Sequence, residues 1–475
     1  MNTPGRRQFL NSAGAGALGM LLSAGLLDGC GKQSDKTPPG RKPNIIILLA
    51  DDMGYGDWEG GGHPTVRTPN LARMAREGVA MTQFYSGCPV CSPSRAALLT
   101  GRNFIRTGVV GVFAPGDAMG MSPDEVTIAD MLKPRGYATA CIGKWHLGDV
   151  PESRPGGQGF DYYYGLLHSN NMYDFKLYRN NEVIEDPVNQ DSLTRRYTEE
   201  AIGFIERNKE KPFFLYLPYT MPHVPVHASE DFKGKSPNGI YGDAIEEIDW
   251  SAGRILETLN SLGLSRDTLA VFTSDNGPAM YKPVPRGSSG IFRGAKGDTW
   301  EGGMRVPFIA WRPGTLPAGK VSRAVGSVID LFPACAGLAG VEIPKDRPYD
   351  GVDLMPVLAG EAIPERTIYY YMNDEMRALR QGKWKLHFVV TRYEGDSYHY
   401  GRTEEKLKEP MLFDLEADPS EHYDVVKEHP DIVARLSSAA NAYKEEIARN
   451  NENAALIEWF KGDAGRGDRR LTPEN

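Results

Sequence analysis

The sequence predicts an α/β fold, in which a mostly parallel β-sheet is covered by helices on both faces. From Pro43 onward, short apolar segments alternate with segments of helical pattern, which is the order that parallel sheets require. The first apolar segment, 44–50, is rich in β-branched residues, as expected of a strand buried on both sides. Polar residues follow the ends of several such segments, and ligand sites of these sheets lie beyond strand ends.

Four predicted strands carry polar side chains at their ends. They are 44–50, followed by Asp51 and Asp52; 137–145, with Lys144 and then His146; 212–217, followed by His223; and 269–273, followed by Asp275 and Asn276. Because the carboxyl ends of parallel strands meet at one edge of a sheet, we expect these side chains to gather there. End signals predict helices at 68–78, 192–208 and 243–262.

The pattern changes near Ile363. Two strand-like segments, 376–380 and 383–388, precede a predicted helix at 430–449. This order suggests a smaller C-terminal α+β subdomain, with an antiparallel sheet and one helix. We therefore expect four parts of the chain, which are a leader at 1–30, a tether at 31–42, a main domain at 43–362 and the subdomain at 363–475.

The composition excludes two classes of protein. With 475 residues, of which 40% are hydrophobic, the chain can bury a large core. A net charge of −8, from 54 Lys and Arg against 62 Asp and Glu, offers no basic field, so no nucleic-acid partner is expected. Five cysteines in a chain of this length do not suggest a disulfide framework.

The N-terminus has the features of an export signal. The order Arg-Arg-x-Phe-Leu begins at Arg6, and a small-residue apolar run follows at 13–27. This resembles a twin-arginine signal, which implies the twin-arginine export machinery as a partner. The run leads to Cys30 in a sequence similar to a bacterial lipoprotein box, from which Asp28 departs. We expect lipidation of Cys30 or, alternatively, ordinary signal-peptidase cleavage, before the flexible tether.

These features predict a localisation. The protein would be exported, as a periplasmic or cell-envelope lipoprotein of a bacterium. It would touch a membrane only through the lipid anchor at Cys30, because the apolar run is about half to three-quarters of a membrane-spanning length.

Two of the cysteines, Cys88 and Cys91, stand three residues apart. A Cys-x-x-Cys pair that opens a helix after a strand is typical of a thioredoxin-like redox site. A zinc site would need a second ligand pair, and no other Cys-x-x-Cys stands in the chain. The residues after the second cysteine favour a third interpretation.

The run Cys-Ser-Pro-Ser-Arg that begins at Cys91 and the Leu-Thr-Gly-Arg that ends at Arg102 resemble the signature of the sulfatase family. In that family the cysteine is oxidised to the aldehyde formylglycine by a formylglycine-generating enzyme, which requires proline two residues on and arginine four on. Cys91 satisfies both requirements. Cys88 does not, since Val90 and Ser92 stand at those places, and we expect Cys88 to be a buried thiol.

The resemblance extends over nearly all of the chain after the tether, in the family's order. The matching segments are 44–56, 143–148, 221–225, 273–277 and 294–303. Segments 164–169 and 274–306 look closest to arylsulfatase A and N-acetylgalactosamine-6-sulfatase. The resemblance implies an alkaline-phosphatase-like fold, a sulfatase catalytic domain at 43–362 and hydrolysis of sulfate monoesters with arylsulfatase-type activity.

Two strand ends supply hard oxygen ligands for a cation. The side chains are Asp51, Asp52, Asp275 and Asn276, which suit Ca²⁺ or Mg²⁺ rather than zinc. The alternative is that these residues cap helices. The resemblance implies Ca²⁺, with an oxygen of the hydrated formylglycine at residue 91 as a further ligand.

The resemblance also implies the chemistry at residue 91. One oxygen of the aldehyde hydrate attacks sulfur and the alcohol leaves; the other oxygen is then deprotonated and expels sulfate, so that one hard step becomes two easier ones. A helix expected from Pro93 to Gly101 places residue 91 at a positive dipole end, which favours anion binding.

The family's catalytic residues match positions of this chain. By resemblance, Asp275 is the base for the first attack and His146 the base that lets sulfate leave. Arg95 and Lys144 hold the hydrate and its oxygens. His223 and Lys296 bind sulfate and protonate the departing alcohol, and Lys144 also contacts the substrate. Ser169 aligns with a substrate-side serine, although His168 or Asn170 could serve instead.

Successive side chains point to opposite sides along the strand predicted at 137–145. Lys144 and His146 are therefore expected on one side, with Cys141 and Trp145 on the other. Cys141, and likewise Cys335, is expected to be a buried core thiol.

Two other functions remain open. The fold that the resemblance implies also serves phosphomonoester and phosphonate hydrolases, and a lipoprotein of this fold could bind sulfated glycans without turnover. We expect the substrate to be a small sulfate ester or a sulfated saccharide, with a sulfated carbohydrate as the natural target.

Overall fold

The computed structural model describes residues 42–173, 175–280, 287–362, 365–393, 402–450 and 452–463. The predicted leader and the tether, except for Lys42, lie outside the described residues. The described chain belongs to one compact unit, which begins at Pro39.

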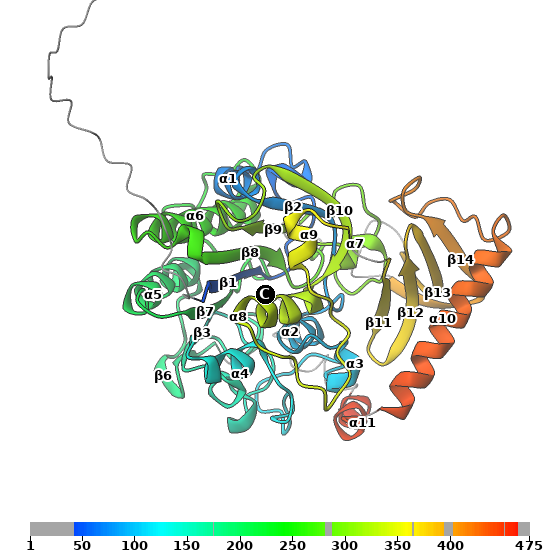
Figure 1. The fold of residues 1–475 in the computed structure, drawn as a ribbon, viewed down its shortest axis with the longest axis horizontal. Coiled ribbons are helices and arrows are strands. Elements are labelled where there is room, and N and C mark those ends of the chain that lie inside the picture. Colours follow the sequence, from blue (N-terminus) through cyan, green and yellow to red (C-terminus); the bar gives the residue numbers. More distant parts are fainter. Residues whose placement is uncertain are drawn as a thin grey trace, which may run out of the picture. The chain divides into compact units, whose positions relative to one another are not determined.

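A mixed sheet forms the centre of the main domain (Figure 1). Among the described residues it has ten strands, in the order β10, β2, β9, β8, β1, β7, β3, β4, β5, β6. They are β1 (Asn44–Ala50), β2 (Val79–Tyr85), β3 (Ala138–Ile142), β4 (Tyr162–Gly165), β5 (Leu177–Arg179), β6 (Glu182–Glu185), β7 (Phe213–Pro218), β8 (Thr268–Ser274), β9 (Phe308–Trp311) and β10 (Lys320–Ser327). The five central strands from β8 to β4 run parallel, which confirms the predicted mostly parallel sheet.

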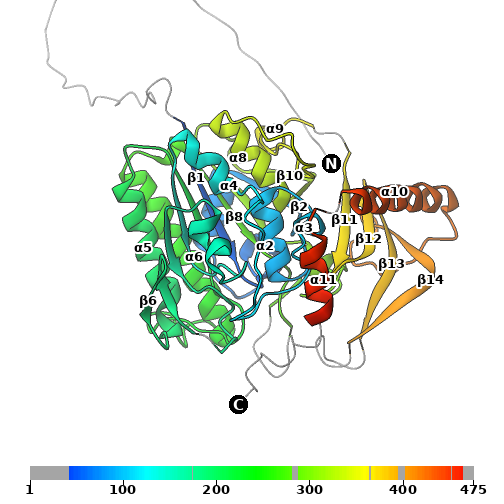
Figure 2. The same ribbon diagram turned by 90° about the horizontal axis from the view of Figure 1, so that it is seen from below.

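Helices cover both faces of this sheet, as the sequence predicts (Figure 2). One layer contains α1 (Pro69–Glu77), α5 (Leu193–Arg207) and α6 (Gly239–Ser261); the other contains α2 (Cys91–Thr100), α4 (Ile128–Leu132) and α8 (Leu331–Ala339). Shorter helices are α3 (Phe104–Thr107), α7 (Glu301–Met304) and α9 (Met355–Ala359).

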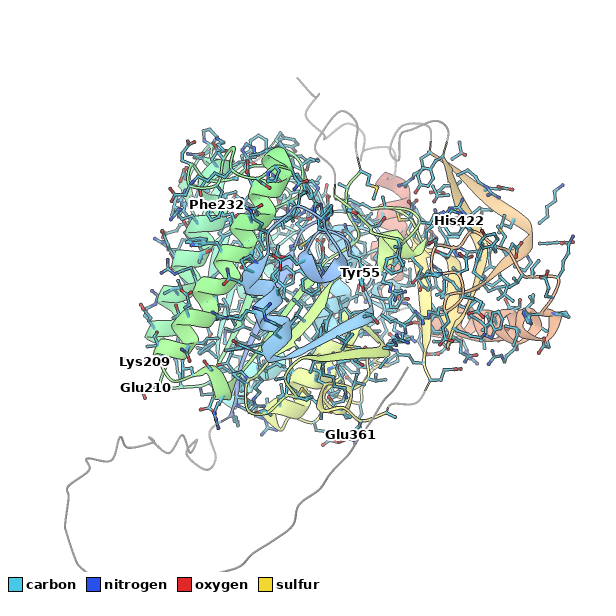
Figure 3. The ribbon with its side chains drawn as sticks, turned by 90° about the horizontal axis from the view of Figure 1, so that it is seen from above. Tyr55, Lys209, Glu210, Phe232, Glu361 and His422 are labelled. Atoms are coloured by element: carbon cyan, nitrogen blue, oxygen red, sulfur yellow. The ribbon has the colours of Figure 1, made fainter. Side chains whose placement is uncertain are left out.

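Strand β1 shows why both layers are needed. Ile46 and Leu48 pack with α1, α5 and α6, whereas Ile47 and Leu49 pack with α2, α4 and α8. All four side chains are fully buried, and each such burial stabilises the fold by about 1.5–3 kcal/mol. Phe232 lies near α6 (Figure 3), and its ring centroid is 5.8 Å from that of Trp250 in this helix.

The strand predicted at 137–145 ends earlier, at Ile142. Gly143 causes this end. Its φ of 132° lies in the region that favours glycine, and a Cβ there would stand 1.8 Å from the carbonyl oxygen of Pro218. Lys144 and His146 therefore lie in a loop after the strand, and the strand geometry predicted for them is wrong.

The C-terminal part contains the predicted antiparallel sheet and helix. The strands are β11 (Thr367–Met372), β12 (Glu375–Gln381), β13 (Trp384–Tyr393) and β14 (Arg402–Asp414), paired in chain order. Helix α10 (Pro430–Arg449) has the predicted bounds and packs through Leu436, Ala440 and Tyr443. A further helix, α11 (Ala454–Asp463), was not predicted.

A buried polar cluster joins the two parts. We call it the interface cluster, and its members are Tyr85, Glu301, Tyr370, Lys385, His387 and Glu421. Lys385 Nζ lies 2.9 Å from Glu301 Oε1 and 3.0 Å from Glu421 Oε1. The backbone N–H of Glu301 donates to Glu421 Oε2 at 2.7 Å. These bonds hold the start of α7 just after the loop that carries Lys296.

Candidate active site

Two neighbouring strand ends bring the predicted carboxylates together. Strands β1 and β8 are parallel, with Ala50 opposite Ser274, so Asp51 and Asp275 follow at the same level. The Asp275 N–H donates to the Ala50 carbonyl at 3.1 Å. Asp52 has a φ of 66°, a left-handed conformation that is uncommon for residues other than glycine and typical of functional sites.

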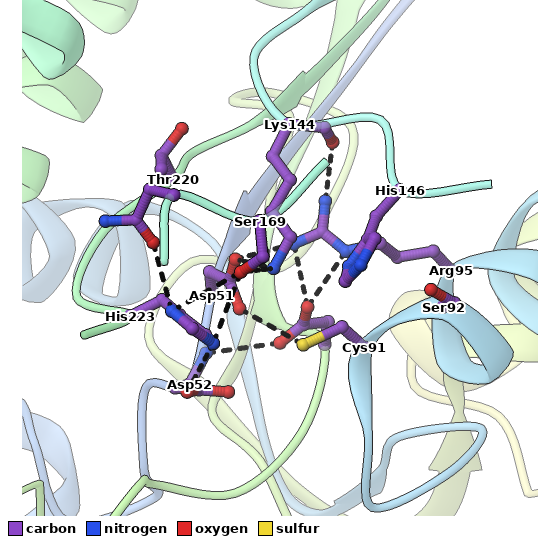
Figure 4. Close-up of polar contacts among 12 residues, drawn as sticks. Asp51, Asp52, Cys91, Ser92, Arg95, Lys144, His146, Ser169, Thr220 and His223 are labelled. Atoms are coloured by element: carbon purple, nitrogen blue, oxygen red, sulfur yellow. Dashed lines mark hydrogen bonds and ion pairs between the residues drawn. The ribbon is translucent and has the colours of Figure 1, made fainter. Parts of the chain in front are cut away.

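Helix α2 delivers Cys91 and Arg95. It begins at Cys91 itself, two residues before the predicted start at Pro93, because Val90 is extended and accepts from the Ser94 N–H at 3.3 Å. The predicted stop is confirmed, since Gly101 caps the helix with a φ of 68°. Cys91 Sγ lies 3.5 Å from Asp51 Oδ1 (Figure 4).

The guanidinium of Arg95 joins three parts of the site. It donates to Asp275 Oδ2 from Nε at 2.9 Å and from Nη2 at 2.7 Å. It also donates to the Lys144 carbonyl at 2.6 Å and lies 3.3 Å from Asp51 Oδ2. Since Arg95 and both carboxylates are fully buried, these ion pairs are shielded from solvent.

The loop after β3 presents Lys144. Backbone bonds from Gly143 to Tyr164 and from Lys144 to Pro218, both 2.8 Å, tie this loop to the ends of β4 and β7. Lys144 Nζ then donates to Asp51 Oδ2 at 2.5 Å and to Ser169 Oγ at 3.1 Å (Figure 4).

The residues predicted to point into the core do so. Trp145 and Cys141 pack in the hydrophobic core, and Cys335 is buried there too. Cys88 is buried beside α2, among residues that include Ala97, and burial raises the pKa of its thiol. Cys88 and Cys91 are both free cysteines.

His146 completes this loop in a left-handed conformation, with a φ of 64°. Its Nε2 lies 3.0 Å from the carbonyl oxygen of Phe113. Its Nδ1 is buried and has no hydrogen-bond partner among the described residues. Burial, together with the charge of Lys144, lowers the pKa of His146 well below its ordinary value, so the imidazole is neutral at neutral pH.

His223 and its neighbours form the opposite side of the site. Nδ1 of His223 lies 3.0 Å from Asn170 Oδ1 and 2.6 Å from the Val224 carbonyl; both are acceptors, so Nδ1 carries a hydrogen. Nε2 lies 3.4 Å from Ser169 Oγ and 3.7 Å from Asp52 Oδ2. Burial, helped by the charge of Lys296, lowers the pKa of His223 to about 4.

Segment 168–170, where Ser169 was the predicted residue, meets the site at more than one point. Ser169 contacts both Lys144 and His223, and Asn170 contacts His223. His168 pairs with Asp149 at 3.1 Å and lies 6.1 Å from the His146 ring. Ser169 and Asn170 thus share His223 as a partner, whereas His168 is bonded to Asp149; which of the three contacts the substrate stays a prediction.

Lys296 lies at the mouth of the site. Its Nζ donates to Asp52 Oδ2 at 2.8 Å, and its side chain is 13% exposed while that of Asp52 is fully buried. The N–H of Gly297 donates to the Pro89 carbonyl at 2.8 Å. This bond ties the Lys296 loop to the segment just before Cys91.

The charges of the site oppose one another at short range. Burial would raise the pKa of Asp51, but the charges of Lys144, His223 and Arg95 outweigh it and hold this pKa well below its ordinary value. Burial and the charge of Asp51 raise the pKa of Asp275 to about 6. Burial, with Asp51 again, raises the pKa of the Cys91 thiol to about 12, so an unmodified thiol at this place is not ionised at neutral pH.

The donor set fits a hard divalent cation. Ligand atoms of Asp51, Asp52, Cys91 and His223 all lie within 4.8 Å of one another. Asn276 adds a buried Oδ1 without a hydrogen-bond partner among the described residues, while its Nδ2 donates to Asp52 Oδ1 at 2.7 Å. The oxygens of Asp51, Asp52 and Asn276 suit Ca²⁺ or Mg²⁺, whereas the Cys91 sulfur and the His223 nitrogen of the same group are softer donors.

Two features of the site were not predicted from the sequence. His223 lies in the group of close ligand atoms, which does not include the predicted ligand Asp275; the assignment of Asp275 as a ligand stays a prediction. Both oxygens of Asp275 have partners, since Oδ2 accepts from Arg95 and Oδ1 accepts from the Asp52 N–H at 3.2 Å. Phe113 was also missed, because it contacts His146 through a backbone carbonyl that no side-chain pattern marks.

Comparisons with known proteins agree with this geometry. The family model described as Sulfatase matches residues 43–341, and the one described as C-terminal region of aryl-sulfatase matches 363–462. An N-acetylgalactosamine-6-sulfatase of Canis lupus familiaris is 38% identical, covering 91% of this chain and 92% of that protein. An arylsulfatase of Hemicentrotus pulcherrimus is 35% identical, covering 86% of this chain and 82% of that protein. The crystal structure of PsFucS1 sulfatase from Pseudoalteromonas sp. superimposes with a TM-score of 0.82 at 29% identity, covering 87% of this chain and 92% of that one.

The localisation expected from the N-terminus is contradicted by these comparisons. Animal proteins, the N-acetylgalactosamine-6-sulfatases of Canis lupus familiaris, Sus scrofa and Homo sapiens, each match 91% of the chain. This finding does not support a periplasmic or cell-envelope lipoprotein of a bacterium, and we set that localisation aside. Within the residues that the structure describes, no helix is both long and apolar enough to cross a bilayer.

The family assignment follows from the whole chain. Both family models match in the expected order, and relatives above 30% identity cover more than four-fifths of the sequence. The fold predicted from the resemblance is confirmed. The chain belongs to the sulfatase family and is a sulfuric ester hydrolase, similar to N-acetylgalactosamine-6-sulfatases and arylsulfatases.

Proposed function

We propose that this protein hydrolyses sulfate monoesters of a sulfated carbohydrate, by means of a formylglycine made from Cys91 and a bound divalent cation. The observation that carries the proposal is the position of Cys91. The residue that bears the modification signature has its Sγ 3.5 Å from Asp51 Oδ1, within the group of potential metal ligands.

The cation would be held by Asp51, Asp52, Asp275, Asn276 and residue 91, and would offset negative charge at the site. Formylglycine, once hydrated, would supply an oxygen nucleophile that the un-ionised thiol cannot replace. The conversion requires a formylglycine-generating enzyme as a partner. Ca²⁺ is the first ion to test, and Mg²⁺ the second.

The chain's own residues do the remaining work. Arg95 and Lys144 hold the oxygens of residue 91, since both cations are buried against Asp51. Asp275 is the base for the first attack. His146 is the base that takes a proton after the alcohol has left.

His223 and Lys296 form the sulfate cradle. Both lie against Asp52 Oδ2, at 3.7 and 2.8 Å, and Ser169 adds a hydroxyl beside Lys144 and His223. A sulfate anion bound between His223 and Lys296 would take the place of the Asp52 carboxylate as their partner. Its negative charge would favour the protonated form of His223. The pair then protonates the departing alcohol.

We infer the natural substrate class from the names of the similar proteins. N-acetylgalactosamine-6-sulfatases match most of the chain, so a sulfated N-acetylhexosamine is the first saccharide to test. Small aryl sulfates such as 4-nitrophenyl sulfate should also be cleaved, because 4-nitrophenolate is a weakly basic leaving group and can depart without the contacts that a natural alcohol would make.

The test combines mass spectrometry with turnover. The chain is co-expressed with a formylglycine-generating enzyme, and the peptide that holds residue 91 is analysed. We expect the aldehyde at residue 91 and release of sulfate in proportion to aldehyde content, first from 4-nitrophenyl sulfate and then from sulfated mono- and oligosaccharides.

Two results would contradict the proposal. Faster cleavage of 4-nitrophenyl phosphate than of the sulfate would support the phosphomonoester hydrolase alternative. Binding of sulfated saccharides by the converted protein, without release of sulfate, would support the non-catalytic alternative.

A further inference from the structure

Phe113 connects Ser92, the neighbour of Cys91, to His146 through its backbone. Its N–H donates to Ser92 Oγ at 3.4 Å, and its carbonyl lies 3.0 Å from His146 Nε2. Ser92 directly follows Cys91 in α2. One loop residue therefore links the start of the helix that bears residue 91 to the imidazole of His146.

The contact with the carbonyl determines the tautomer of His146. A carbonyl oxygen can only accept a hydrogen bond, so Nε2 must carry the hydrogen. In a neutral imidazole the lone pair then lies on Nδ1. This atom is buried and has no partner among the described residues, so Nδ1 is the ring atom that can take a proton.

Helix α11 holds Phe113 in place. The Phe113 ring is fully buried, with centroids 5.1 Å from Phe460 and 6.2 Å from Trp459. Gly111, two residues earlier, approaches the same helix so closely that a Cβ would stand 2.7 Å from the Phe460 ring.

A polar contact ties the chain before α11 to the same region. Asn453 Nδ2 donates to the Arg106 carbonyl at 2.8 Å and to Glu125 Oε1 at 3.0 Å. The start of α11 is thus bonded to the segment that follows α2. The helix is anchored at its start and contacts Phe113 near its end.

We propose that Phe113 is a positioning residue for the base, and that α11 holds it there. The Phe113 carbonyl orients the His146 ring and keeps Nδ1 free to accept the proton, while Trp459 and Phe460 fix the Phe113 peptide. This inference rests on the proposed function, in which His146 acts after the alcohol has left. Loosening α11 therefore slows the second chemical step and leaves the first unchanged.

The experiment is a double-mutant cycle between Phe460→Ala and His146→Ala, with 4-nitrophenyl sulfate. Phe460→Ala alone should lower kcat about tenfold with little change in the binding of substrate, as expected when a reacting group is misplaced. In the His146→Ala background the same change should have less than about a twofold effect, because the group that it positions is absent.

The first turnover gives a second readout. In Phe460→Ala, rapid mixing should show a burst of 4-nitrophenolate, in amount equal to the aldehyde-bearing protein, followed by a slow steady state. A merely structural defect would lower the burst and the steady rate together. Phe460→Leu, which keeps an apolar contact, should restore part of kcat.

Leu436→Ala in α10 is the matched control. Leu436 is fully buried in the C-terminal part and belongs to a different hydrophobic cluster from Phe113. It should lower stability and leave kcat unchanged. Equal losses of kcat from Phe460→Ala in both backgrounds, or no burst, would overturn the inference. A wild-type protein with aldehyde but no turnover would instead overturn the proposed function.

Discussion

Two buried charged clusters among the described residues, the interface cluster and the active site, differ in how their polar groups are bonded. In the interface cluster, each carboxylate oxygen has donors from the chain itself. Glu301 Oε1 accepts from Lys385 and Tyr370, and its Oε2 accepts from Tyr85. In the active site, by contrast, Asp51 and Asp52 are crowded with Cys91, and the Asn276 Oδ1 has no partner among the described residues.

Glu301 and Asp275 differ in pKa, although Asp51 in the active site is, like Glu301, held at a low pKa by its neighbouring cations. Burial raises the pKa of Glu301, but the charges of Lys385 and Arg305 outweigh it and bring this pKa down to about 2. Burial and the neighbouring Asp51 raise the pKa of Asp275 to about 6. The two carboxylates of the interface cluster are bonded to donors of the chain itself, which serves stability, whereas the active site crowds Asp51 and Asp52 beside residue 91, as the proposed metal site requires.

The largest effect should come from the active site without any change in fold. Cys91→Ala should lower turnover of 4-nitrophenyl sulfate by more than about 10⁴-fold, because it removes the nucleophile. The thermal unfolding midpoint should stay within a few degrees of the wild type. Retained turnover would remove Cys91 from the mechanism.

In the interface cluster the order of effects should be reversed. Lys385→Met leaves Glu301 and Glu421 without their shared cation, so the free energy of unfolding should fall by about 3–5 kcal/mol, measured with urea. Turnover per folded molecule should fall far less than it does in Cys91→Ala, because Lys385 bonds the Thr299 carbonyl near the Lys296 loop and no reacting group is removed. Lys383→Met is the control, because Lys383 is 39% exposed and its ion pair should contribute less than about 1 kcal/mol. Equal losses from both variants would contradict the comparison.

The pH dependence of stability should separate the clusters further. The pKa of Glu301 is lower in the folded protein than its ordinary value of 4.5. Its contribution to stability is therefore full above 4.5 and is lost as pH falls toward about 2, a loss of about 3 kcal/mol. Thermal midpoints of the wild type should fall more steeply below pH 4.5 than those of Glu301→Gln. An exposed control, Glu428→Gln, should keep the wild-type slope.

Calcium should stabilise the protein only through the active site. A free Ca²⁺ concentration of about 100 times the dissociation constant should raise the free energy of unfolding by about 2.7 kcal/mol. The chelator EDTA should reverse the shift. Asp52→Asn should weaken the response and Lys385→Met should keep it. A wild-type thermal unfolding midpoint that changes with neither Ca²⁺ nor Mg²⁺ would contradict the predicted metal site.

The smallest effect should come from Cys88, the first cysteine of the Cys-x-x-Cys pair. Cys88→Ala should keep turnover within about twofold and lose about 1 kcal/mol of stability, which is the usual cost of a small buried change. Aldehyde content at residue 91, measured by mass spectrometry, is the control. A large loss of turnover with normal aldehyde content would mean that Cys88 acts in the chemistry.

Much of the fold and of the site could be predicted from the sequence, since the signals are local. The apolar run before Asp51 ends at the predicted residue, and α10 has the predicted bounds. The side chains of Asp51, Lys144, His223 and Asp275 follow strands that lie side by side. The N-terminal leader and the domain boundaries stay predictions.

The sequence by itself determined which residue types stand at which strand ends, because apolar runs, glycines and the Cys91 signature are patterns within short stretches of the chain. Only the tertiary structure decided how His146 is held, that His223 joins the close ligand atoms, and that α11 reaches Phe113. Those contacts join segments far apart in the chain, and the one to His146 uses a backbone carbonyl, which every residue has. Side-chain patterns therefore could not reveal them, and packing alone selects them.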